Sequence, residues 1–86
     1  MSQNKKLLNR ILNGHNDSNI SFSELCLILD RLGFNKRIRG DHHIYAREDV
    51  KEIINIQPRG NMAKPYQVKQ VRAIINLYKI GGNDEL

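Results

Sequence analysis

The residues best suited to chemistry lie in one short stretch, where two arginines precede a Gly-Asp turn and two histidines follow it. Arg37 and Arg39 come just before Gly40-Asp41, and His42 and His43 come just after it. A histidine can accept a proton near neutral pH, and fixed cations can hold a phosphate while negative charge builds on it. The same residues also fit a hairpin that carries basic side chains without any catalytic role.

RNA cleavage needs few protein groups, because the ribose 2′-hydroxyl is itself the nucleophile. One histidine to take the hydroxyl proton and several cations for the phosphate meet this need. The candidates are His42 or His43, with Arg37, Arg39, Lys64, Lys69 and Arg72. The cations at 69, 72 and 79 are either phosphate contacts or an ordinary solvated helix face. Tyr45 either stacks on a base or packs in its strand.

Other kinds of site have little support in this sequence. His42 and His43 are neighbours in a predicted strand, so they point to opposite faces, and no cysteine or acidic pair stands at zinc-ligand spacing. Cys26, the single cysteine, lies in an apolar helical run with no base near it in sequence, and we interpret it as a buried thiol. We expect no metal and no cofactor.

The predicted positioning elements are three strands, because apolar and polar residues alternate around the turn. We expect strands at 34–39, 42–46 and 52–57, with residues 59–64 as a loop. The alternation places His42 and Ile44 on one face and His43 and Tyr45 on the other. In the third strand, Asn55 lies on the face opposite to Ile54 and Ile56.

Three helices complete the predicted fold. Apolar spacing indicates a helix at 5–12, and the sequence from Ser21 to Glu24 matches a capping box before a second helix that stops at Gly33. Pro65 is well placed to begin a final helix that runs to about Tyr78 and is ended by Gly81-Gly82. The predicted fold class is α+β in the order α-α-β-β-β-α, a three-stranded antiparallel sheet with helices packed on one face.

Length and charge set the remaining limits. A chain of 86 residues with a net charge of +5 and a pI near 9.7 predicts one basic domain with polyanionic partners. The excess lies in residues 34–79, which hold ten Lys and Arg against four Asp and Glu. No apolar run is long enough to span a membrane, and the lack of a disulfide framework fits a reducing compartment. We therefore expect a cytoplasmic protein without membrane contact.

The hairpin and the final helix together resemble the HicA toxin family over about residues 23–80. The motifs that carry this resemblance are Leu32-Gly33-Phe34, Arg39-Gly40-Asp41-His42-His43-Ile44-Tyr45, Asn55-Ile56-Gln57-Pro58 and Lys64-Pro65-Tyr66-Gln67-Val68-Lys69-Gln70-Val71-Arg72. The resemblance implies a fold like the double-stranded-RNA-binding domain and a toxin that cleaves mRNA with a strand histidine. It also implies a HicB-like antitoxin partner. The family's histidine falls on His42, or on His43 if the alignment shifts by one residue.

The sequence departs from the family pattern near this histidine and at the N-terminus. Asp41 stands where a Ser or Gly is usual, and it could either orient His42 or repel a phosphate. We expect a single domain over 1–86, with a core at about 20–80 and an added helix at about 5–12. The expected function is that of a type II toxin, a metal-independent mRNA interferase. The alternatives are a non-catalytic RNA-binding module of the same fold and a protein-binding adaptor.

Overall fold

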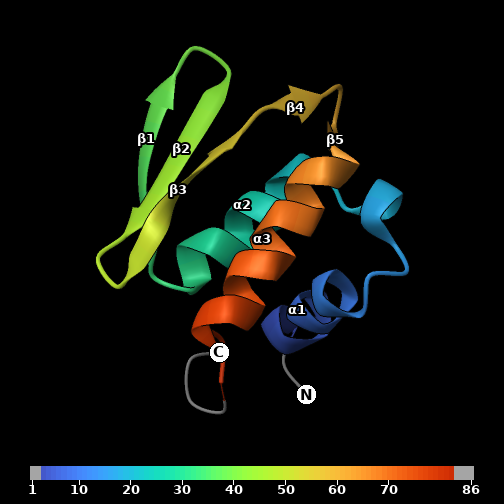
Figure 1. The fold of residues 1–86 in the computed structure, drawn as a ribbon. Coiled ribbons are helices and arrows are strands. Elements are labelled where there is room, and N and C mark those ends of the chain that lie inside the picture. The colour runs from blue at the N-terminus through green and yellow to red at the C-terminus, as the bar shows by residue number, and fades with distance from the viewer. Residues whose placement is uncertain (1–2, 83–86) are drawn as a thin grey trace.

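The computed structural model describes residues 3–82 and has its helices on one side of a three-stranded sheet (Figure 1). The predicted α+β class and the predicted order of the main elements are confirmed. Residues 1, 2 and 83–86 of the predicted domain lie outside the described part. The elements are α1 (Gln3–Asn13), the 3-10 turn η1 (Asp17–Asn19), α2 (Phe22–Arg31), β1 (Asn35–Arg39), β2 (His42–Arg47), β3 (Val50–Ile56), β4 (Pro58–Arg59), β5 (Met62–Ala63) and α3 (Pro65–Tyr78).

The sheet is an antiparallel meander in the order β1-β2-β3. Arg39 pairs with His42 across the first turn, and His43 pairs with Ile56 across the second interface. Because directly paired residues share a face of the sheet, this register decides which side chains meet. The third strand starts at Val50, two residues earlier than predicted, because Val50 already pairs with Arg47.

The helix α2 begins as the sequence predicted. The Ser21 hydroxyl accepts a hydrogen bond from the Glu24 amide at 3.1 Å, and the Glu24 carboxylate accepts one from the Ser21 amide at 2.9 Å. The predicted capping box is therefore present, and it satisfies two amides that the first helical turn leaves free. The helix stops before Gly33, whose φ of +84° is readily adopted only by glycine.

One core joins all three helices to the inner face of the sheet. The helix α1 belongs to this core, since three of its side chains are buried in it. In Figure 1, α2 and α3 lie next to the sheet, and α1 lies on their far side. The most deeply buried large side chains are Tyr45, Ile11, Ile20, Leu25, Ile28, Leu29, Ile54, Ile56, Ile75, Val68 and Val71.

Two local features differ from the prediction. The expected loop at 59–64 contains a second small hairpin, β4–β5, whose Ala63 amide donates to the Ile20 carbonyl at 3.0 Å. This bond joins the hairpin to the start of α2. The final helix ends at Tyr78 as predicted, but the residue that ends it is Lys79, which takes the left-handed conformation with a φ of +54°, and not Gly81-Gly82. No helix within residues 3–82 is long and apolar enough to cross a membrane.

Candidate functional site

The candidate site lies on the face of the sheet that the helices leave uncovered. His42 pairs with Arg39, and Arg37 pairs with Ile44, so both arginines share this face with His42. Both arginines are exposed, and the side chain of His42 is 47% exposed. Asn55 lies diagonally across from His42 on the neighbouring strand, and its Oδ1 is 3.0 Å from His42 Nδ1. The other ring nitrogen, Nε2, has Asp41 Oδ1 at 3.9 Å.

A chain of polar contacts joins the Gly-Asp turn to the start of α3. Gln57 Nε2 donates to Asp41 Oδ2 at 2.8 Å, and Lys64 Nζ donates to Gln57 Oε1 at 3.2 Å. The hydrogen bond from Gln57 is the main reason that the pKa of Asp41 lies below its usual value. Asp41 is therefore ionised at neutral pH and held beside His42. Lys64 is brought to the site through Gln57.

The second candidate histidine faces the other way. The ring of His43 packs edge-on against Phe22 at a centroid distance of 4.9 Å, and its Nδ1 is 3.8 Å from Cys26 Sγ. The sequence showed no base near Cys26, but the fold brings one there. Burial nevertheless raises the pKa of the Cys26 thiol, which fits its interpretation as a neutral, buried group. The two histidines are thus separated by the sheet.

The two cations of α3, Lys69 and Arg72, act on Asp17 of η1. Arg72 donates to both carboxylate oxygens of Asp17, at 2.7 and 3.1 Å, and to the Ile11 carbonyl at 3.0 Å. The side chains of Arg72 and Asp17 are only 19% and 12% exposed, respectively. These hydrogen bonds, with a smaller contribution from Lys69, hold the pKa of Asp17 below its usual value. Arg72 therefore ties α3 to α1 and η1, and its guanidinium is already occupied.

Tyr45 is fully buried, so it packs in its strand and has no face for a nucleic-acid base. Its hydroxyl has no hydrogen-bond partner within residues 3–82, and burial, together with the nearby Cys26 thiol, raises its pKa. Of the two interpretations of this residue, the structure supports packing.

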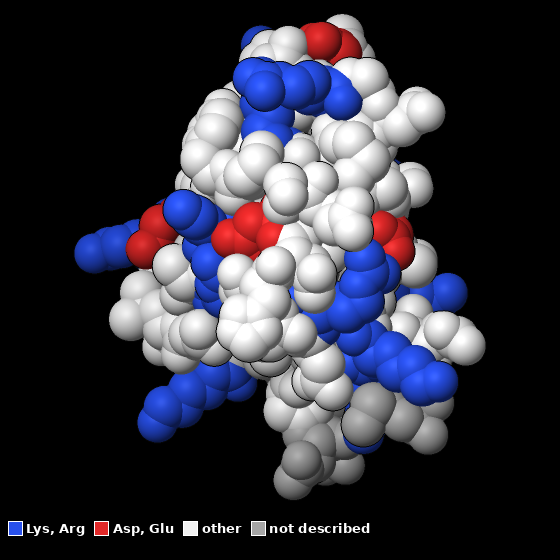
Figure 2. All heavy atoms as spheres, turned by 90° about the vertical axis from the view of Figure 1, so that its right-hand side faces the viewer, with Lys and Arg blue, Asp and Glu red and all other residues white. Residues whose placement is uncertain are grey.

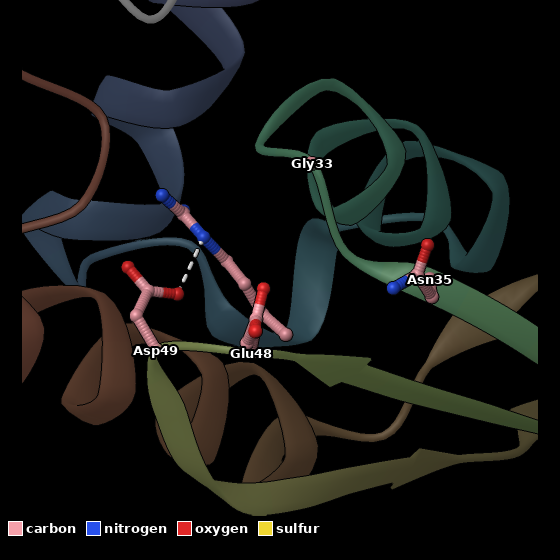
Figure 3. Close-up of a pocket in the computed structure, with 5 residues that line it drawn as sticks. Gly33, Asn35, Glu48 and Asp49 are labelled. Atoms are coloured by element: carbon pink, nitrogen blue, oxygen red, sulfur yellow. Dashed lines mark ion pairs between the residues drawn. The ribbon is translucent and has the colours of Figure 1, made fainter.

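Two other surfaces of the molecule differ from the His42 face. On the side that faces away from the sheet, Lys and Arg form several separate groups with Asp and Glu between them (Figure 2). A pocket lined by Gly33, Asn35, Arg47, Glu48 and Asp49 lies where β1 begins and β2 ends (Figure 3). There Arg47 forms an ion pair with Asp49 at 2.8 Å. His42 starts β2, five residues or roughly 17 Å along the strand from this pocket.

Three polar residues near His42 had been given no role from the sequence. Asn55 lies in β3, and Gln57 lies two positions later, directly after the strand. The register between β2 and β3 could therefore have placed both residues on the His42 side. Gln67 is buried in α3, and its Oε1 accepts from the Gln57 amide at 3.2 Å. Nothing in the helical pattern marked this polar residue as buried. Within the described residues, no three His, Cys, Asp or Glu form a group that could hold a metal.

A comparison with models of known protein families identifies the family of this chain. Residues 22–77, more than half of the 86-residue chain, match the family model described as "HicA toxin of bacterial toxin-antitoxin". The chain belongs to the HicA toxin family. Neither the search of curated proteins nor the search of solved structures found a match.

Membership of the HicA family makes this chain a toxin of a toxin–antitoxin pair, with an antitoxin as its partner. The matched segment runs from the start of α2 almost to the end of α3, so it includes the hairpin and His42. The helix α1 lies outside the matched segment. It still contributes Leu7, Leu8 and Ile11 to the common core.

Proposed function

We propose that this HicA protein is an mRNA interferase that cleaves RNA without a metal, and that His42 is its general base. The observation that carries the proposal is a half-exposed histidine on an open, basic sheet face in a HicA chain. His42 can approach a ribose from solvent, and Arg37 and Arg39 can contact the phosphates on either side of it.

The proposed reaction is a transesterification within the RNA. His42 Nε2 takes the proton of the 2′-hydroxyl, and the 2′-oxygen attacks the adjacent phosphorus. The bond from phosphorus to the 5′-oxygen breaks, and water supplies the proton that this leaving oxygen needs. The products are a 2′,3′-cyclic phosphate and a 5′-hydroxyl. Arg39 and Lys64 offset the charge that develops on the non-bridging oxygens.

The proposal uses some of the candidate residues named from the sequence and leaves out others. Arg37, Arg39 and Lys64 are the proposed RNA contacts around His42, and Lys69 is an outlying contact on α3. We leave out Arg72, because its guanidinium is paired with Asp17. His43 is also left out, because it lies on the helix side of the sheet. The proposed protein partner is a HicB-like antitoxin that covers the His42 face.

The test compares RNA cleavage and RNA binding in EDTA for the wild type, His42→Ala and His15→Ala. His15 is an exposed loop residue, so its replacement controls for the loss of any histidine. We expect the wild type and His15→Ala to cut RNA, and His42→Ala to bind RNA without cutting it. Binding by all three proteins without cleavage would favour the non-catalytic RNA-binding module. Equal cleavage by all three would show that His42 is not the base.

A further inference from the structure

We propose that Asn55 is a positioning residue, which fixes the His42 ring so that Nδ1 carries the proton and Nε2 is free to act as the base. This inference rests on the proposed function and assigns a role to a residue next to the catalytic one. Its basis is the 3.0 Å contact between Asn55 Oδ1 and His42 Nδ1. An amide oxygen can only accept a hydrogen bond, so the ring nitrogen facing it must be the donor.

The strand register makes this contact a fixed feature of the sheet. His43 pairs with Ile56 and Ile44 pairs with Asn55, so His42 and Asn55 are diagonal neighbours on the uncovered face. Side chains in such positions can reach each other without leaving the sheet geometry. The turn at Gly40-Asp41 and the β2–β3 pairing therefore bring the two side chains together.

Asn55 is itself held in place from the helix layer. Gln67, buried in α3, accepts from the Gln57 amide at 3.2 Å and donates to the Asn55 carbonyl at 3.4 Å. These two bonds tie the end of β3 to α3 on both sides of Ile56. The backbone that carries Asn55 is thus restrained by the body of the domain, as a residue that orients a catalytic group requires.

The two nitrogens of His42 therefore have different surroundings. Nδ1 faces the Asn55 oxygen, whereas Nε2 lies 3.9 Å from the Asp41 carboxylate, which is too long for a hydrogen bond. Asp41 is in turn held by Gln57 at 2.8 Å. A ring with its proton on Nδ1 presents a free lone pair at Nε2. The nearby carboxylate then stabilises the positive ring that forms when Nε2 takes a proton.

The experiment reads the ring directly by ¹⁵N NMR of the histidine side chains, at a pH high enough for the rings to be neutral. The variants are Asn55→Ala, which removes the acceptor, and Asn55→Asp, which keeps it. Asn35→Ala is the matched control, because Asn35 is an exposed asparagine at the far end of the same sheet. Backbone amide signals show whether each variant is folded.

In the wild type we expect His42 to carry its proton on Nδ1. Asn55→Ala should shift the ring toward the Nε2–H form, while Asn55→Asp and Asn35→Ala should keep the wild-type signature. The cleavage rate of Asn55→Ala should fall by roughly 10–100-fold, the usual range for residues that orient a functional histidine, with RNA binding unchanged. Asn55→Asp should recover part of that loss.

Two results would overturn the inference. One is a wild-type ring with its proton on Nε2, and the other is an Asn55→Ala ring that keeps the wild-type signature. Failure of the proposed function has a different signature, because a wild type that does not cut RNA would leave the ring measurement readable. A ring that responds to Asn55→Ala in such a protein would support the control of His42 by Asn55 and refute only its use in cleavage.

Discussion

At the scale of single residues, the three histidines are distinguished by their surroundings. His15 is an exposed loop residue, and His43 packs between Phe22 and Cys26 on the helix side of the sheet. His42 is half exposed, and polar side chains approach both of its ring nitrogens. A group that transfers protons to and from a bound substrate needs both access and a defined orientation. Among the three, His42 has both.

Arg72 is expected to act on stability and not on cleavage. Replacing it by alanine removes two hydrogen bonds to Asp17 and one to the Ile11 carbonyl. Hydrogen bonds to charged groups contribute about 1.5–3 kcal/mol, so we expect Arg72→Ala to lower the free energy of unfolding by about that amount. Urea denaturation at neutral pH measures this loss. Arg72→Lys keeps the charge but not the paired geometry, so it should restore only part of the loss.

The ion pair between Asp17 and Arg72 should make the stability of the fold depend on pH. The pKa of Asp17 is lower in the folded protein than its ordinary value of 3.8, so its ionised form stabilises the fold. This stabilisation is complete above the ordinary value and is lost as the pH falls through the lowered one. The gap between wild type and Arg72→Ala should therefore shrink below about pH 4. A gap that stays constant into acid would show that Asp17 is not the partner that matters.

At the scale of elements, the start of α2 depends on its capping box. Ser21→Ala removes the acceptor for the Glu24 amide, and the loss of such a cap typically costs about 1 kcal/mol. Ser21→Asp keeps an acceptor at the same position and is the matched control. Chemical denaturation should place Ser21→Asp close to the wild type and Ser21→Ala below it. Equal stability of all three would mean that the cap contributes nothing here.

The strand β1 is expected to supply phosphate contacts through Arg37 and Arg39. Each cation that contacts a phosphate of single-stranded RNA adds about 0.7 to the slope of log K against log salt concentration. Replacing both arginines by alanine should therefore weaken binding and flatten the slope by about 1.4. The matched control replaces Lys6 of α1 and Arg31 of α2, two exposed cations outside the sheet. Identical slopes for the two double variants would locate the RNA elsewhere.

Elements that arise from short-range sequence patterns could be predicted, whereas elements that depend on long-range contacts could not. The capping box at Ser21 and Glu24 and the alternation around Gly40-Asp41 are short-range patterns, and both features are confirmed. The β4–β5 hairpin was not predicted, because strands of two residues show no alternation. Its place depends on long-range bonds such as that from Ala63 to Ile20. The helix α3 ends at Tyr78 as predicted, but the residue that ends it was not predicted, because Lys79 and not a glycine takes the left-handed conformation directly after the helix.

The candidate site could be predicted only in part, for the same reason. Strand alternation separated His42 from His43 correctly, since each side chain's face follows from its position. The pairing of Arg72 with Asp17 could not be predicted, because the two residues are 55 positions apart and no local pattern indicates the contact. The contact of His42 with Asn55 required the register between two strands, and a shift by one residue would have removed it.

At the scale of the whole molecule, α1 is an integral part of the domain although it lies outside the family match. Ile11 is fully buried, as is Ile28 of α2. We expect Ile11→Ala to cost about 2–5 kcal/mol, as is typical for buried aliphatic side chains and similar to the cost of Ile28→Ala. Leu12→Ala, at a partly buried position, should cost less. Thermal and urea unfolding of the three variants measures these costs, and a small loss for Ile11→Ala would show that α1 is dispensable.

The whole molecule is thus a HicA toxin whose helices cover one side of a three-stranded sheet and leave its other side, where RNA is proposed to bind, uncovered. The chemical ends of the RNA fragments test the proposed mechanism most directly. In EDTA, the wild type should produce fragments with 2′,3′-cyclic phosphates and 5′-hydroxyls, and folded His42→Ala should produce none. Fragments with 5′-phosphates and free 3′-hydroxyls would contradict a reaction in which His42 activates the ribose 2′-hydroxyl.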